Sequence, residues 1–296
     1  MMLRHIRYFL AVAEHRNFTR AAEALHVSQP TLSQQIRQLE DVLHTQLLDR
    51  SGRHVQLTDA GLAWMRYAKL ALQDLDAGVR AIHDVSELNR GSLRLALTPT
   101  FSAYLVAPLM DRFHGLHPGI TIDIQEITQD QIEAQIADDR LDVGIAFEPV
   151  HSSDIESDPL FRETLSLVVG RGHARATRRK PLSTKDFASE RVVLLNKAFA
   201  TRRYIDEYCM QNRIRPQVAI EASSIGAIVE IVRRGQLATV LPNRIAREHA
   251  ELHHVLLEPP LPARTVVLLQ RKDGYRTAAS KAFVQALKEV VEVFRR

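Results

Sequence analysis

The sequence predicts a two-lobed α/β domain that follows a small all-α domain and one long connecting helix. Three observations carry this prediction. Residues 1–58 contain short segments with apolar side chains at every third or fourth position, and residues 59–90 continue that spacing without a break. Residues 91–296 instead alternate strand-like and helical segments, which is typical of an α/β fold. A length of 296 residues is ample for about two domains.

The first sixty residues predict three short helices. The segment 3–15, LRHIRYFLAVAEH, has the apolar spacing of an amphipathic helix. Asn17 offers an N-cap for a second helix, FTRAAEALH. Ser28 can cap a third helix, which tolerates Pro30 in its first turn. The third helix has a polar face and an apolar stripe, formed by Leu32, Ile36, Leu39 and Leu43.

Two short helices joined by a tight turn, the second with a polar face near its start, are typical of a helix-turn-helix that reads DNA. Gln and Arg can bond base edges, and Ser and Thr can bond bases or phosphates. The stretch LLDRSGRHVQLT then predicts a β-wing that reaches phosphate or a minor groove. The alternative is a plain helical bundle with a solvated polar face. The candidate DNA contacts are Ser28, Gln29, Pro30, Thr31, Ser33, Gln34 and Arg37 on the helix, and Arg50, Arg53 and His54 on the wing.

Residues 59–90 predict one long helix with a heptad seam. At about 1.5 Å per residue it would extend roughly 45 Å, which is longer than a core helix usually needs. We therefore expect a coiled-coil dimer. The alternative is that the C-terminal domain covers this stripe within one chain. The seam consists of Met65, Ala68, Leu72, Leu75, Val79 and Ile82.

The C-terminal two hundred residues contain two series of strands and helices, which predicts two lobes. The first series begins with the strand SLRLALT and the second with LSLVVGR. The strand RTVVLLQRK and a helix from Thr277 close the chain. We expect lobe I to contain residues 91–161 and 267–296, and lobe II to contain residues 162–266.

Hydroxyl-bearing side chains stand where several of these strands pass into helices. In open α/β sheets ligands bind beyond the carboxyl ends of the strands, where helix N-termini offer unpaired N–H groups. The pattern therefore favours a small anionic effector, although each hydroxyl alone can equally be a helix cap. Arg202 can add positive charge or can equally be a surface residue, whereas Glu148 would oppose an anion if it faced the cleft. The candidate effector contacts are Thr98, Thr100, Phe101, Ser102, Thr128, Phe147, Ala200, Thr201, Arg202 and Ser224.

Composition and motifs argue against catalysis, metal binding and membrane insertion. The chain has no GxSxG, P-loop, HExxH or GxGxxG motif. Its thirteen histidines are scattered without the spacing of metal ligands, except for the adjacent His253 and His254. Cys209 is the only cysteine, which excludes an internal disulfide and a Cys-based zinc site. No apolar run approaches the ~20 residues of a membrane helix, and no signal peptide is evident. We expect a cytoplasmic protein that is not an enzyme and has no cofactor; its net charge of +4 mildly favours an anionic partner.

The order AAEALH, SQP, LSQQIRQLE and DRSGR resembles the winged helix-turn-helix of LysR-type transcriptional regulators over residues 1 to about 60, and the remaining chain agrees in length and layout. The resemblance implies a winged helix-turn-helix domain in 1–58, a linker and dimerisation helix in 59–90, and an effector domain like periplasmic solute-binding proteins in 91–296. It also implies a homodimer, commonly a homotetramer, on double-stranded promoter DNA, with contact to RNA polymerase. The positions that match the usual inducer contacts are Thr100, Ser102, Thr128 and Thr201.

Within that family, stretches such as FTRAAEALHVSQPTLSQQIRQLE, KAFATRRYIDEYC and RTVVLLQRKDGYRTAASKAF resemble the activators of cyanate-degradation (cyn) operons. This resemblance implies cyanate, a small linear anion, as the inducer. A LysR-type regulator that responds to another small organic acid stays open, because a fold changes its ligand readily. Two other classes are a solute-binding protein, which would need export, and an architectural DNA-binding protein, which would not need a bilobed domain.

Overall fold

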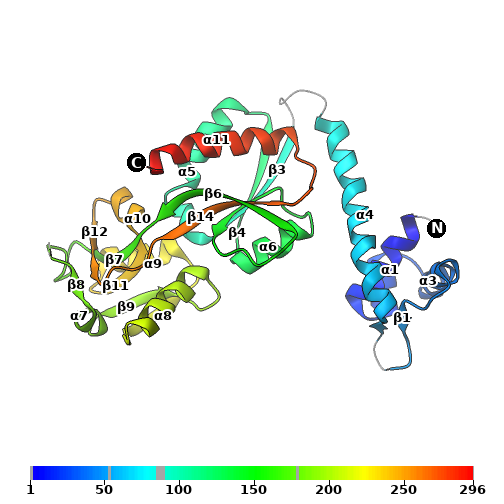
Figure 1. The fold of residues 1–296 in the computed structure, drawn as a ribbon, viewed down its shortest axis with the longest axis horizontal. Coiled ribbons are helices and arrows are strands. Elements are labelled where there is room, and N and C mark those ends of the chain that lie inside the picture. The colour runs from blue at the N-terminus through cyan, green and yellow to red at the C-terminus, as the bar shows by residue number, and fades with distance from the viewer. Residues whose placement is uncertain (1–2, 53–54, 85–90, 178–179, 296) are drawn as a thin grey trace. The chain divides into compact units, whose positions relative to one another are not determined.

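The computed structural model describes residues 3–52, 55–84, 91–177 and 180–295 (Figure 1). The chain separates into two compact units, Met1–Arg80 and Ala81–Arg296. The first unit contains the predicted helix-turn-helix, and the second contains the predicted α/β lobes.

The N-terminal unit packs three short helices and a two-stranded antiparallel hairpin around one core. Phe9, Leu32, Ile36 and Leu39 are fully buried in this core, as the apolar spacing predicted. Asn17 caps the second helix, because its Oδ1 accepts the backbone N–H of Arg20 at 3.0 Å. The elements are α1 (Leu3–His15), α2 (Phe18–Ala24), α3 (Gln29–Leu43), β1 (Leu48–Asp49), β2 (Gln56–Leu57) and α4 (Asp59–Asp84).

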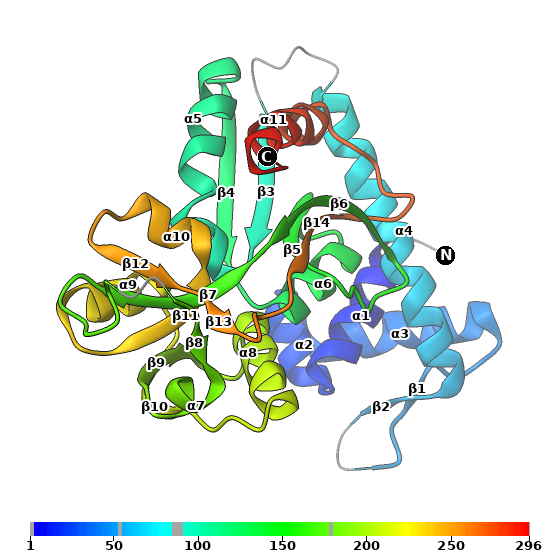
Figure 2. The ribbon, with the colours of Figure 1, turned by 60° about the vertical axis from the view of Figure 1, so that its left-hand side comes forward.

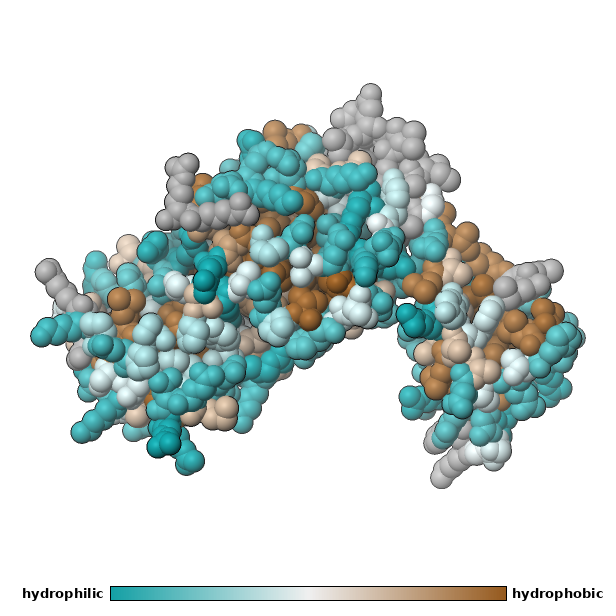
Figure 3. Space-filling model, in the orientation of Figure 1, coloured by the Kyte–Doolittle hydropathy of each residue, from teal (hydrophilic) through white to brown (hydrophobic). Residues whose placement is uncertain are grey.

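The heptad seam of α4 divides into a packed part and an exposed part. Ala68 is buried, and Met65 packs against the helix-turn-helix core. Leu75 and Val79 expose 52% and 56% of their surface. Hydrophobic residues accordingly gather at the surface along this helix (Figure 3). The side chain of Ile82, the last predicted seam position, lies outside the described residues.

Lobe I is a five-stranded sheet in the order β4-β3-β5-β14-β6. The strands β3, β4 and β5 run parallel, and β14 runs antiparallel to both of its neighbours. Helices α5 and α11 pack on one face, and α6 packs on the other. The elements are β3 (Gly91–Leu97), η1 (Pro99–Ala103), α5 (Val106–Leu116), β4 (Ile120–Glu126), α6 (Gln129–Ala137), β5 (Val143–Phe147), β6 (Ile155–Glu163), β14 (Arg264–Arg271) and α11 (Ala278–Arg295).

Lobe II is a five-stranded sheet in the order β10-β9-β11-β7-β12, with a small second pair, β13-β8. Helix α9 packs against η1 as well as against its own sheet, while α7 and α8 belong to a separate core. The elements are β7 (Leu165–Gly170), β8 (Leu182–Ser183), α7 (Thr184–Ala188), β9 (Arg191–Leu195), α8 (Ala200–Gln211), β10 (Gln217–Ala222), α9 (Ile225–Arg234), β11 (Ala238–Pro242), α10 (Asn243–Glu248), β12 (Leu252–Val255) and β13 (Leu257–Glu258).

The chain crosses between the lobes at two places that lie side by side. The first crossing is at Thr164, between β6 and β7, and the second lies between Glu258 and Arg264 (Figure 2). The expected lobe boundaries, at 161/162 and 266/267, are therefore corrected: they fall inside β6 and β14, which pair with each other up to Glu163 and Arg264. One hydrophobic core contains residues of both lobes, so the two lobes pack against each other.

Candidate functional site

The polar face of α3 is open at its N-terminal end, as a DNA-reading helix requires. Ser28 caps the helix by accepting the backbone N–H of Thr31 at 3.3 Å, and its hydroxyl lies 2.7 Å from the Thr31 hydroxyl. Ser33 is half-buried. The remaining predicted contacts on α3 are exposed, namely Ser28, Gln29, Pro30, Thr31, Gln34 and Arg37.

The wing is held by a carboxylate from the reading helix. Glu40 of α3 accepts the backbone N–H groups of Leu47 and Leu48 at 2.9 and 3.1 Å, and the Arg50 guanidinium at 2.6 Å. The Arg50 guanidinium also lies 5.2 Å from the centre of the Phe18 ring. Arg50 is exposed and at the same time joins the wing to α3 and α2, so its contact with DNA stays a prediction. The other two predicted wing contacts, Arg53 and His54, lie outside the described residues.

In the second unit, the turn between β3 and α5 carries three hydroxyls that no described residue satisfies. Thr98 and Thr100 are 4% and 1% exposed, and the hydroxyls of Thr98, Thr100 and Ser102 are buried without a hydrogen-bond partner among the described residues. Thr98 precedes η1 but makes no capping bond with its side chain. A buried polar group without a partner is costly, so these hydroxyls are suited to receive a ligand or water.

Two other predicted hydroxyls serve as helix caps. Thr128 forms a capping box with Gln131 at the start of α6, and Ser224 accepts the backbone N–H of Ala227 at the start of α9. Their polar capacity is therefore largely used within the protein. Among the hydroxyls proposed from the sequence, the structure thus separates caps from unpartnered groups.

A cavity of about 210 Å³ lies between α6 and the loop after β5 on one side and α8 on the other. Two of the predicted effector contacts, Phe147 and Ala200, line this cavity. Glu148 lines it as well and therefore faces the cleft. The lining includes two acidic residues, Glu148 and Glu207, and two basic residues, Arg203 and Arg264. The lining residues are Gln129, Phe147, Glu148, Pro149, His151, Ala200, Arg203, Tyr204, Glu207 and Arg264.

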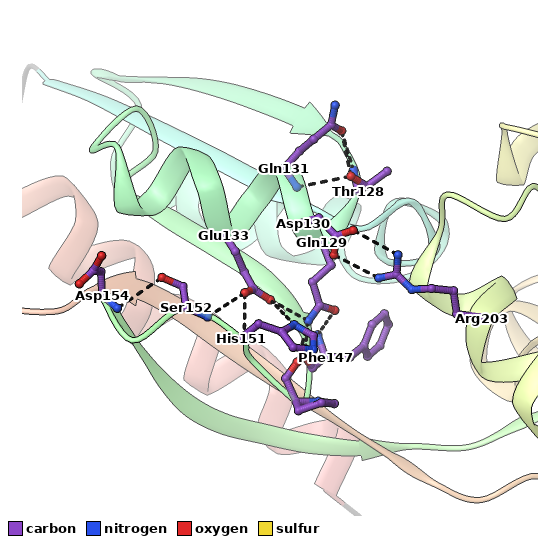
Figure 4. A network of polar contacts seen from close by, with 11 residues as sticks. Thr128, Gln129, Asp130, Gln131, Glu133, Phe147, His151, Ser152, Asp154 and Arg203 are labelled. Carbon is purple, nitrogen blue, oxygen red and sulfur yellow. Dashed lines mark hydrogen bonds and ion pairs between the residues drawn. The ribbon is translucent and has the colours of Figure 1, made fainter. Parts of the chain in front are cut away.

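The lobe I wall of this cavity is built by the first turns of α6 (Figure 4). Gln129, which is buried, donates to the carbonyl oxygens of Phe147 and Pro149 at 2.9 and 3.0 Å. Glu133, also buried, accepts the backbone N–H of His151 at 2.9 Å. The loop that follows β5 is consequently held in place by two side chains one helical turn apart.

An ion pair joins the two walls at the edge of the cavity. Both terminal nitrogens of Arg203, on α8, donate to Asp130, on α6, at 3.2 Å (Figure 4). Both side chains are about half exposed or more, so the pair adds little stability by itself. Its position across the cleft nevertheless makes it sensitive to any change in the distance between the lobes.

Beneath the cavity lies a buried polar cluster around Arg264. Its Nε donates to Glu163 at 2.7 Å, its Nη1 donates to the Thr201 hydroxyl at 3.0 Å, and its Cζ lies 3.6 Å from the centre of the Phe147 ring. The Tyr104 hydroxyl donates to the other oxygen of Glu163. Burial and the adjacent Glu163 charge raise the pKa of Tyr104 well above its usual value, so this hydroxyl stays protonated.

Two further predicted effector contacts, Arg202 and Phe101, do not line the cavity. Arg202 is buried and donates to Asp206 at 2.8 Å and to Glu221 at 2.6 Å, so the expectation that it adds positive charge to the cleft is corrected. Phe101 is fully buried in the core, with its ring 5.0 Å from that of Phe147. It supports the cavity wall from behind.

The described residues contain no grouping of three His, Cys, Asp or Glu side chains that could hold a metal ion. None of the described helices is long and apolar enough to cross a membrane.

A helix-turn-helix with an open polar helix and an α/β unit with a polar cleft between its lobes together define a DNA-binding regulator with a ligand-binding domain. Family models agree: residues 3–62 match the bacterial regulatory helix-turn-helix protein of the lysR family, and residues 86–292 match the LysR substrate binding domain. The chain belongs to the LysR family of transcriptional regulators, which bind small-molecule effectors in the latter domain and are not enzymes.

Individual proteins resemble the chain over nearly its whole length. A hydrogen peroxide-inducible genes activator from Pectobacterium carotovorum is 32% identical over 274 residues, or 92% of this chain and 90% of that protein. A probable RuBisCO transcriptional regulator from Thalassiosira pseudonana is 29% identical and covers 96% of both chains. The solved structure of a full-length OxyR variant from Pseudomonas aeruginosa is 24% identical, with a TM-score of 0.67 over 99% of this chain and 95% of that one. It shares the fold.

Proposed function

We propose that this LysR-type regulator is switched by a small anionic effector that binds between the two lobes of its α/β domain. One observation carries the proposal: three buried hydroxyls without partners among the described residues, of Thr98, Thr100 and Ser102, share one strand-to-helix turn. That turn lies against the cavity wall, because the Phe101 ring contacts the ring of Phe147. Hydroxyls at such a turn can donate hydrogen bonds to an anion.

Cyanate is the first effector to test, because the resemblance of the sequence to the cyn regulators concerns stretches along most of the chain. A cavity of about 210 Å³ holds several water molecules, so a three-atom anion would share it with water. A small organic acid would fill more of this space. We therefore keep a regulator of another small organic acid as the alternative.

The name of the Pectobacterium relative raises hydrogen peroxide as a different stimulus. Peroxide oxidises thiolates, and this chain has one cysteine, Cys209. Burial raises the pKa of Cys209 to about 11, so the reactive thiolate is scarce near neutral pH. A single cysteine also cannot form a disulfide within one chain. These features favour a bound effector over a thiol switch.

The exposed apolar residues of α4 support a homodimer through a coiled coil. Leu62, Leu75 and Val79 each expose more than half of their surface. A two-fold dimer presents two reading helices to two half-sites of an interrupted palindrome in promoter DNA. We propose further that two dimers form a tetramer in the cytoplasm and that effector binding changes how it bends DNA and contacts RNA polymerase.

The test is binding of the protein to the DNA upstream of its own gene, at fixed salt, with cyanate or with chloride at equal ionic strength. A specific complex whose mobility or footprint changes only with cyanate supports the proposal. A specific complex that is indifferent to cyanate rejects this effector, and small carboxylates are then assayed in the same way. Loss of the complex after mild thiol oxidation, without any response to anions, would favour the peroxide alternative.

A matched pair of variants tests the hydroxyl site. Thr100→Val and Thr239→Val each replace a buried hydroxyl, unpartnered among the described residues, by a methyl group of similar shape. Both should leave stability unchanged or raise it by about 1 kcal/mol, because an unsatisfied polar group disappears. Only Thr100→Val, in the turn behind the cavity wall, should lose the response to effector. Equal responses in the two variants would remove Thr100 from the site.

A further inference from the structure

The buried Arg264 lies where the two lobes are joined. It begins β14, and Glu163 ends β6; the two residues are opposite each other in the paired strands. Both side chains are almost completely buried, at 3% and 1% of side-chain exposure. Glu163 directly precedes the first chain crossing, and Arg264 directly follows the second. An ion pair at this position is part of the hinge between the lobes.

The Arg264 guanidinium contacts both lobes at once. Two of its nitrogens, Nε and Nη2, approach the same carboxylate oxygen of Glu163, in lobe I. Its Nη1 donates to the hydroxyl of Thr201, which is the second residue of α8 in lobe II. Any ligand that draws the guanidinium away from Thr201 therefore acts directly on the join between the lobes.

Arg264 also has donor capacity left over, and it lines the cavity. A guanidinium has five N–H donors, and Nη2 has no hydrogen bond of good geometry with any described residue although it is buried. The face of the guanidinium is covered by the Phe147 ring, so a ligand must approach it at its edge. Glu163 already shares the Arg264 charge, so the edge of the guanidinium can stabilise at most one further negative charge. A second would also meet Glu148 and Glu207 at the rim.

We propose that Arg264 is the residue that reads the effector, by donating from its edge to one oxygen or nitrogen of a small monoanion, and that this contact weakens its bond to Thr201. The effector class is a monoanion, cyanate or a small monocarboxylate, and dianions are rejected. This inference rests on the proposed effector site. It adds the counter-ion, the charge selectivity and the route by which binding changes the hinge.

The experiment uses the full chain and two variants of the buried pair. Glu163→Gln keeps the shape of the side chain; its oxygen can accept from Arg264 and its amide can donate to the Tyr104 hydroxyl. The double variant Glu163→Gln/Arg264→Gln removes both buried charges together, so no charge is left unpaired in the interior. Arg112→Gln is the control, because it removes an exposed, ion-paired cation of lobe I that does not line the cavity.

Affinities for cyanate, acetate and malonate are measured by the shift in the thermal unfolding midpoint, against chloride at equal ionic strength, together with the change in the DNA complex. Glu163→Gln is expected to bind the effective monoanion at least about tenfold more tightly, because the competing carboxylate is gone. The double variant is expected to lose at least about tenfold and to stop changing the DNA complex. Arg112→Gln is expected to change affinity by less than about threefold.

Three outcomes overturn the inference. A double variant that folds and still responds as the wild type does removes Arg264 from the site while the effector proposal stands. A wild-type preference for malonate over acetate rejects the monoanion selectivity. A wild type that binds its DNA but responds to none of the three anions refutes the anionic effector site, and the role of Arg264 with it.

Discussion

Removing the Glu40 carboxylate should release the wing from the reading helix. The side chain is 11% exposed, and it accepts two backbone N–H groups and one guanidinium. Glu40→Ala leaves the N–H groups of Leu47 and Leu48 without an acceptor, at a cost of about 1 to 3 kcal/mol each. The pair with Arg50, whose side chain is 31% exposed, adds about 1 kcal/mol or less. The local loss is therefore at least about 2 kcal/mol.

Hydrogen exchange of the Leu47 and Leu48 amides measures this loss directly, because a tenfold rise in exchange corresponds to about 1.4 kcal/mol. Glu40→Ala should raise their exchange by at least about thirtyfold. Arg50→Ala, which keeps both acceptors, should raise it by less than about tenfold. Unchanged protection in α1 shows that the domain remains folded. A rise below about threefold in Glu40→Ala would refute the reasoning, since these bonds would then not hold the wing.

Three further predictions follow from single side chains. Arg37→Ala should weaken binding to the operator more than binding to random DNA, by about 1 to 3 kcal/mol, whereas an equal loss on both would make Arg37 a phosphate contact. Cys209 should be alkylated by iodoacetamide about a hundredfold more slowly in the native than in the denatured chain near neutral pH, because its pKa rises from 9.0 to about 11; equal rates would contradict this. Gly170→Ala should lower the unfolding temperature, because its new methyl group would lie 2.3 Å from the carbonyl oxygen of Val232. Gly78→Ala is the control: its methyl group would meet nothing within 4 Å, and it should stabilise the helix by about 1 kcal/mol. An unchanged unfolding temperature in Gly170→Ala would show that the strand can shift.

The same cysteine makes stability depend on pH in one direction. Its folded pKa is the higher one, so the native chain holds the proton to higher pH than the unfolded chain does. Below about pH 9 the thiol is protonated in both the native and the unfolded chain, so the free energy of unfolding does not depend on pH through this group there. Between about pH 9 and about 11 the unfolded thiol ionises first, so stability falls as the pH rises through this range. Replacement of Cys209 by Ala should remove this part of the alkaline destabilisation.

Local features of the fold were predictable because each depends on a few neighbouring residues. The caps at Asn17 and Ser28 and the buried stripe of α3 are examples. Strand β6 was missed, because it is an edge strand with mostly exposed residues and contains Pro159, so it shows little apolar alternation. One helix was expected to begin at Ser102, whereas Pro99–Ala103 is a short 3₁₀ turn and α5 begins at Val106.

The candidate cleft was predictable only in part, for a related reason. Strand-to-helix joins are visible in the sequence, and they led to Thr100 and Thr201. Nothing near Arg264 in the sequence marks it as part of a site, because its partner Glu163 is 101 positions away and the two meet only through strand pairing. Gln129 was missed likewise, since its role depends on the carbonyl groups of a loop eighteen and twenty positions later.

The hydroxyls at the helix starts show why structure is needed to separate stability from function. Thr128 caps α6, so removing its hydroxyl should cost stability. The hydroxyls of Thr98, Thr100 and Ser102 have the same chemistry but no partner among the described residues, so each lowers the stability of the ligand-free fold. Their opposite effects on stability separate the hydroxyls that cap a helix from those that are unsatisfied in the fold, and only the response to effector can then distinguish Thr100 from Thr239. A stabilised Thr100→Val protein that no longer responds to effector would establish that distinction.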